Sequence, residues 1–172
     1  MQRWQMVGIS ALVVGLVMLP AGGNAQQKSM KDLLVGTWTL LLDDNVKDDG
    51  THAPSFGPNP DGILVFTTDG HYSLQIVRNS RPAFASKDRL TGTADENKAA
   101  IQGMISHFGT YVVDEAGKTV TFRIEASSFP NWDATTQKRA ITALTDEVLT
   151  YNNPTPSTSG YVRAELAWKK VK

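Results

Sequence analysis

The sequence predicts an all-β domain folded as a closed, antiparallel, up-and-down barrel of about eight strands with one short α-helix. Short runs of alternating apolar and polar residues recur along most of the chain, separated by turns rich in Asp, Asn, Gly and Pro. A single segment has convincing helical periodicity. Consecutive strands joined by short turns pair antiparallel, and closing such a sheet removes its exposed edges. A barrel is therefore favoured over a sandwich, which is the alternative.

The N-terminal residues 1–25 have the pattern of a secretory signal peptide. Arg3 precedes an apolar run over residues 6–19, and small residues before Gln26 suit cleavage after Ala25. The run is about 14 residues long, shorter than the roughly 20 needed to span a bilayer, which disfavours a membrane anchor. We expect an exported protein, periplasmic or secreted, without stable membrane insertion after cleavage.

Composition narrows the possible partners. The chain has no cysteine, which excludes disulfides and a lipid-modified cysteine anchor. Removing Arg3 with the leader leaves 16 of the 17 basic residues against 17 acidic ones. This balance gives no electrostatic footprint for nucleic acid. The remaining chain of about 147 residues fits one domain, and the sequence does not indicate an oligomeric state.

The first half of the mature chain is expected to hold a leader, a strand, a long loop and a hairpin. Residues 26–32 are a polar, mobile leader, and the domain proper spans residues 33–172. A first strand covers 34–44, and the Asp-, Gly- and Pro-rich stretch 43–61 is a loop. Two β-rich runs, 63–67 and 71–77, flank an Asp-Gly turn and predict a hairpin.

The one predicted helix begins at a capping box formed by Thr93 and Glu96. Apolar residues then follow at helical spacing, namely Ile101, Met104, Ile105 and Phe108. Gly109 stands where a helix C-cap belongs. We expect an amphipathic helix of about 14 residues that packs its apolar stripe on the sheet.

The remaining chain predicts two more hairpins and a closing strand. One hairpin spans 110–127, another spans 135–153, and a loop at 153–160 precedes the last strand, 161–170. Trp38 and Trp168 lie on the first and last strands, which must pair to close a barrel. We therefore expect both tryptophans in the core.

Several segments resemble the lipocalin-like domain family of small bacterial and fungal proteins, from about Leu33 to Trp168. They are "LVGTWTL", "FGPNPDGILVFTTDGHYSLQ", "NSRPAFASKDRLTGT" and "FPNWDATTQKR". The resemblance implies a closed barrel with one short helix, of a type that usually holds small apolar molecules, although some related barrels are enzymes. It also implies a family motif that includes the positions of Glu125, Trp132, Gln137 and Arg139. Leu64 stands where family members often have an aromatic residue.

The sharper catalytic and metal-binding signatures are absent from the sequence. There is no Gly-x-Ser-x-Gly elbow, phosphate loop, His-Glu-x-x-His motif or cysteine nucleophile. His52, His71 and His107 fall on a predicted loop, strand start and helix end, whereas metal sites need clustered ligands. No metal and no cofactor is predicted.

The polar faces of the strands leave two alternatives open. Arg123 and Glu125 share one face of their strand, and Phe122 and Ile124 share the other. Antiparallel sheets usually turn the polar face to water. In the inverted arrangement the polar face lines the lumen, where a buried Arg would need Glu125 or a ligand anion as partner.

The resemblance favours the inverted arrangement, which gives the predicted site. We expect Arg123, Glu125, Gln137 and Arg139 to face the lumen, with Trp132 near its mouth. The predicted ligand-binding residues are these five together with Gln75, Phe129 and Tyr111.

Three functions follow as alternatives. The first is an exported protein that binds a small, largely apolar molecule in the barrel. The second is an isomerase or cyclase in which Glu125 or His71 moves a proton and Arg139 stabilises an enolate or carboxylate. The third is a filled barrel with a structural or interaction role. A cavity in the barrel would separate the first two from the third.

Overall fold

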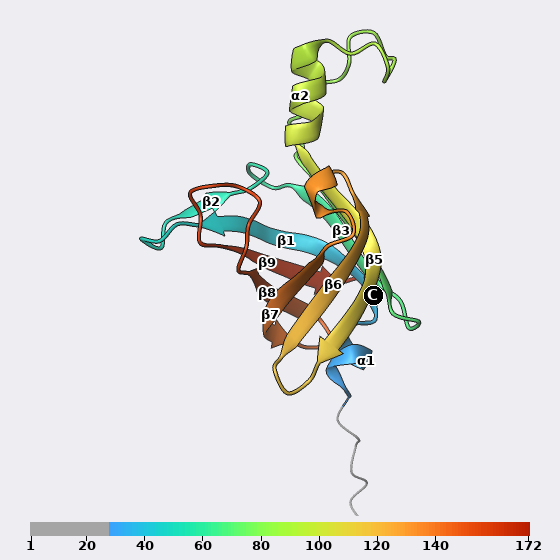
Figure 1. Ribbon diagram of the computed structural model, residues 1–172, viewed down its shortest axis with the longest axis vertical. Coiled ribbons are helices and arrows are strands. Elements are labelled where there is room, and N and C mark those ends of the chain that lie inside the picture. The colour runs from blue at the N-terminus through green and yellow to red at the C-terminus, as the bar shows by residue number, and fades with distance from the viewer. Residues whose placement is uncertain (1–27) are drawn as a thin grey trace, which may run out of the picture.

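The computed structural model describes residues 28–172, and the predicted signal peptide lies outside this range. The chain forms a nine-stranded antiparallel sheet that closes through pairing of its first and last long strands (Figure 1). Its strands are β1 (Gly36–Val46), β2 (His52–Pro54), β3 (Asp61–Phe66), β4 (His71–Val77), β5 (Met104–Asp114), β6 (Thr119–Ser127), β7 (Thr136–Leu144), β8 (Val148–Asn153) and β9 (Arg163–Lys170).

The predicted fold class is confirmed. Sheet order follows chain order from β3 to β9, and β1 pairs with both β3 and β9, so that eight strands form the closed barrel. The extra strand, β2, pairs with the far end of β1 and lies in the stretch that the sequence pattern predicts as a loop. The three predicted hairpins form as β3–β4, β5–β6 and β7–β8.

One end of the barrel is closed by the helix α1 (Met30–Leu34), which includes part of the expected leader. A capping box joins Ser29 and Asp32, and Leu34 is fully buried. The Leu34 carbonyl accepts a hydrogen bond from the indole N–H of Trp38 at 2.8 Å. Trp38 and Trp168 are both fully buried, as predicted.

The second helix, α2 (Ala94–Gln102), differs from its prediction in length and packing. Its capping box forms as expected, because Thr93 Oγ1 accepts from the backbone N–H of Glu96 at 3.2 Å. The helix ends at Gln102, however, and none of its residues is buried. It points away from the barrel (Figure 1). No helix within residues 28–172 is long and apolar enough to cross a membrane.

The apolar residues expected at the end of that helix belong to β5 instead. Met104, Ile105 and Phe108 pair with Val77, Ile76 and Ser73 of β4. Long-range pairing therefore overrides the local helical spacing, as tertiary context commonly does.

The expected C-cap role of Gly109 is also wrong. Gly109 lies in β5 at an irregularity of the β5–β6 pairing, where Phe108 opposes Ala126 and Gly109 opposes Ile124, so that Glu125 is the additional residue of a bulge. Gly109 has φ +156°, and a Cβ there would overlap the carbonyl oxygen of Arg123. The close approach of two backbones explains the glycine.

A second bulge changes which side of β1 faces inward. The pairing of β1 with β9 shifts between Leu40 and Leu42. Before this shift Trp38 is buried in the core, and after it Asp43 and Asn45 are buried. The extra residue therefore brings polar side chains of β1 into the barrel.

Candidate functional site

The barrel contains a cavity of about 460 Å³ at the end away from α1. Side chains of the strands form its walls, while the C-terminal end of α2, the short 3₁₀ helix η1 (Pro130–Trp132) and residues 156–158 border it. The other half of the barrel is packed with apolar side chains, among them Trp38, Leu64, Phe66, Val120, Leu149 and Trp168. The alternative of a completely filled barrel is therefore wrong.

Arg139 brings a positive charge into this cavity. It lies opposite Val120 in the β6–β7 ladder, shares the inward face, and is 4% exposed. Its guanidinium donates to the side-chain oxygen of Gln137 and, at 3.2 Å, to the carbonyl of Lys138. Its Cζ lies 5.6 Å from the centre of the Phe122 ring, within the range of a cation–π contact.

Arg139 is surrounded by neutral hydrogen-bonding groups. The Tyr72 hydroxyl and His107 Nδ1 are 2.8 Å apart. Burial, with a contribution from Arg139, lowers the pKa of His107 to about 3, so the imidazole is neutral at physiological pH. Burial raises the pKa of both Tyr72 and Tyr151, although Arg139 opposes the shift in each case. Both tyrosines therefore remain protonated.

Aromatic rings continue the cavity toward η1. The Trp132 ring meets the His107 ring edge-on at 5.7 Å, and Phe129 meets Trp132 in the same manner at 5.8 Å. Trp132 is half-buried, while Phe129 is exposed. Both line the cavity, which gives it an apolar, aromatic wall.

The opposite wall carries Asp43 and Asn45 from β1. The Ser55 hydroxyl donates to the Asp43 carboxyl group at 2.9 Å. Burial raises the pKa of Asp43 to about 6, although the Ser55 hydrogen bond opposes this shift. Asp43 is thus a much weaker acid than an exposed aspartate.

The structure brings together four of the eight predicted ligand-binding residues. Arg139, Trp132 and Phe129 line the cavity, and Gln137 supports Arg139 through its side-chain oxygen. Tyr111 is buried, but it lies outside the cavity lining and donates its hydroxyl to the Thr67 carbonyl at 2.9 Å.

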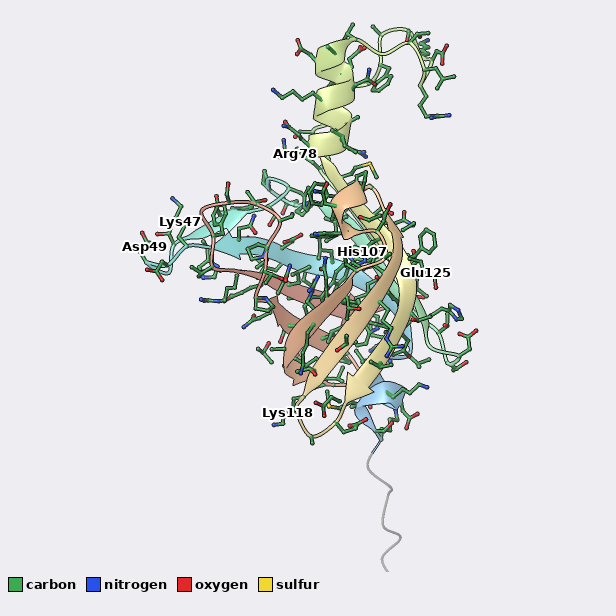
Figure 2. All side chains as sticks on the ribbon, viewed as in Figure 1. Lys47, Asp49, Arg78, His107, Lys118 and Glu125 are labelled. Carbon is green, nitrogen blue, oxygen red and sulfur yellow. The ribbon has the colours of Figure 1, made fainter. Side chains whose placement is uncertain are left out.

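The expectation that Arg123 and Glu125 face the lumen is wrong. Phe122 is buried and lies opposite Gln137 in the β6–β7 ladder. Arg123 is exposed and faces outward, opposite Thr136. Glu125 is exposed as well, and Figure 2 shows it at the outer edge of the barrel with His107 inside. The physical reason is the alternation of a strand: burying Phe122 and Ile124 exposes their neighbours.

Two other expected polar residues also lie on the outer surface. Gln75 is exposed, between the buried Leu74 and Ile76 of β4. His71 is exposed at the start of the same strand. The proton-moving residues of the isomerase or cyclase alternative, Glu125 and His71, thus do not face the cavity.

Sequence reasoning missed most of the polar lining. The sequence pattern places His107 at a helix end, but in the structure it pairs with Leu74 across β4–β5 and faces inward. Leu74 belongs to the alternating apolar face of β4. Because residues opposite each other share a face, pairing with Leu74 places His107 on the inward face as well. Asp43 could not be found in this way, because the bulge in β1 that turns it inward has no sequence signature.

Metal binding has no support in the described part of the chain. Between residues 28 and 172 there is no cluster of three or more His, Asp or Glu side chains that could hold an ion.

Comparison with known proteins gives a family and a relative. The 4'-hydroxy-3'-methoxypropiophenone carrier protein ppsC of Aspergillus oryzae is 28% identical over 107 residues, which are 58% of this chain and 96% of that protein. A solved structure of a redesigned β-barrel aligns over 85% of this chain and 98% of its own, with a TM-score of 0.43 and 13% identity. The sequence profile of the lipocalin-like domain matches residues 35–171. The chain belongs to the lipocalin-like domain family.

Proposed function

We propose that this protein is an exported carrier that binds one small, largely apolar molecule in the barrel cavity. The observation that carries the proposal is the cavity of about 460 Å³, which combines aromatic and aliphatic walls with a few buried polar groups. Small-molecule sites have this volume and composition, in which apolar walls supply affinity and polar groups fix orientation.

Family membership and the relative support a carrier role. Lipocalin-like barrels are suited to holding a small ligand, and the Aspergillus oryzae relative is named as a carrier of an aromatic ketone. In this chain Trp132 and Phe129 form an aromatic wall beside His107. An aromatic ring of the ligand would stack or pack edge-on against these rings.

Export is the second part of the proposal. It rests on the basic start, apolar run and small-residue cleavage site within residues 1–25. Cleavage after Ala25 would leave Gln26 as the first residue.

The proposed binding is tested with a neutral fluorescent probe, N-phenylnaphthylamine, whose emission rises in an apolar site. Ala164 is buried, lies on β9 and lines the cavity. Ala164→Phe places a ring in the cavity and should weaken probe binding at least tenfold, about 1.4 kcal/mol. Ala140→Phe is the matched control, because Ala140 is exposed on β7, and it should bind as the wild type does.

Circular dichroism and thermal melting would show that both variants are folded. Failure of the wild type to bind the probe, or equal binding by the Ala164→Phe and Ala140→Phe variants, would contradict the proposed cavity site. The ketone in the relative's name, 4'-hydroxy-3'-methoxypropiophenone, serves as a competitor of the probe in the same assay.

A further inference from the structure

We propose that the bound molecule is an acid, and that its carboxylate or a comparable anionic group is held inside the cavity by Arg139. This inference rests on the proposed function and adds the chemical class of the ligand.

Arg139 has donors without matching acceptors. A guanidinium carries five N–H donors and a charge that proteins do not remove. Within residues 28–172, the acceptors for Arg139 are the oxygens of Gln137 and Lys138, both neutral, and no carboxylate lies within 4.0 Å. Because the residue is 4% exposed, bulk water replaces little of the missing partner. A buried cation without an anion costs several kcal/mol.

Asp43, the acidic side chain of the cavity lining, does not fill this role. Its carboxyl group bonds to Ser55 on the β1 side, and among the described residues it is not paired with Arg139. Burial raises the pKa of Asp43 to about 6, although the Ser55 hydrogen bond opposes this shift. Asp43 is therefore not the ion-pair partner of Arg139.

Arg78 adds a second positive charge to the same cavity. It follows β4, next to the base of α2 (Figure 2), and it lines the cavity. Its Nε is buried and has no hydrogen-bond acceptor in the described part of the chain. Two arginines that have no carboxylate partner between residues 28 and 172 thus border one cavity, which favours an anionic occupant over a neutral one.

The groups near Arg139 select an acid with an apolar body. Tyr72 and Tyr151 stay protonated and neutral because burial raises the pKa of each, and the His107 imidazole is neutral because burial lowers its pKa. They can orient a carboxylate by hydrogen bonds but cannot neutralise Arg139. A planar guanidinium matches the two oxygens of a carboxylate, and Trp132 and Phe129 offer an aromatic wall.

The test is displacement of N-phenylnaphthylamine at neutral pH by two competitors of nearly the same shape, cinnamate and cinnamamide. The wild type should prefer the charged cinnamate at least tenfold, about 1.4 kcal/mol. In Arg139→Met this preference should fall to about twofold or less. Arg123→Met removes the same charge from the outer face of the adjacent strand and should keep the wild-type preference.

Equal displacement by both competitors in the wild type would overturn the inference while leaving probe binding, and so the proposed function, intact. Retention of the full preference in Arg139→Met would overturn it as well. Failure of the wild type to bind the probe would instead count against the proposed function. Should Arg139→Met not fold, Arg139→Lys keeps the charge without the planar fork, and its preference must be weaker than that of the wild type.

Discussion

At the scale of single residues, Arg139 is the feature that most needs an explanation. It is buried, its acceptors within residues 28–172 are neutral, and the cation–π contact with Phe122 offsets only part of the cost of leaving water. In contrast, Arg123 lies one strand away on the outer surface, where water hydrates its charge. A residue that lowers the stability of the empty barrel is consistent with a role in binding.

The ligand-free protein should therefore tolerate loss of this charge. We expect Arg139→Met to raise the free energy of unfolding by about 1 kcal/mol, because it removes a buried cation while keeping an apolar stem. Chemical denaturation of the empty protein measures this change. Arg123→Met, the exposed control, should lie within about 0.5 kcal/mol of the wild type. A loss of about 3 kcal/mol in Arg139→Met would show instead that the guanidinium is well paired.

At the scale of elements, strand alternation determines which polar residues reach the cavity. The sequence pattern correctly predicts that Arg123 and Glu125 share one face of β6. It also predicts that Gln137 and Arg139 share one face of β7. It could not show that Phe122 pairs with Gln137, which places the two groups on opposite sides of the wall. Register is a long-range property, and a shift of one residue exchanges the faces.

Turn and capping signals were more reliable because they are local. The Asp-Gly turn between β3 and β4 and the Thr93 capping box both form as predicted. The end of α2 was missed because pairing of β5 with β4 competes with the helix over the same apolar residues. The family resemblance includes the positions of Arg139 and Trp132. The inward orientation of Asp43, in contrast, follows from a bulge in β1.

The bulge beside Gly109 gives a prediction for an element. Gly109→Ala should lower the free energy of unfolding by about 2 kcal/mol more than Gly50→Ala does, because a Cβ at Gly109 would overlap the Arg123 carbonyl oxygen. Gly50 has φ +82° and open space within 4 Å of where a Cβ would lie, so its substitution measures backbone strain alone. Urea denaturation of both variants provides the comparison. Equal losses would mean that the β5–β6 bulge relaxes to accept a side chain.

At the scale of the whole molecule, the barrel has a packed half and a half that contains the cavity. The helix α1 and the two core tryptophans close the first half, while η1, α2 and residues 156–158 surround the entrance to the second. The packed core and the cavity thus occupy different layers of the same closed sheet. Arg139 and Trp132 of the cavity lining lie outside the β1–β9 pairing, whereas lining residues such as Asn45 and Ala164 belong to it.

Native mass spectrometry of the protein recovered from its own host would show whether this barrel carries a small molecule in its cavity. We expect a chain that begins at Gln26, with the added mass of one small molecule that is released on denaturation. Recovery of the bare chain alone, with no added mass even after incubation with a small-molecule extract of the host, would contradict the proposed function.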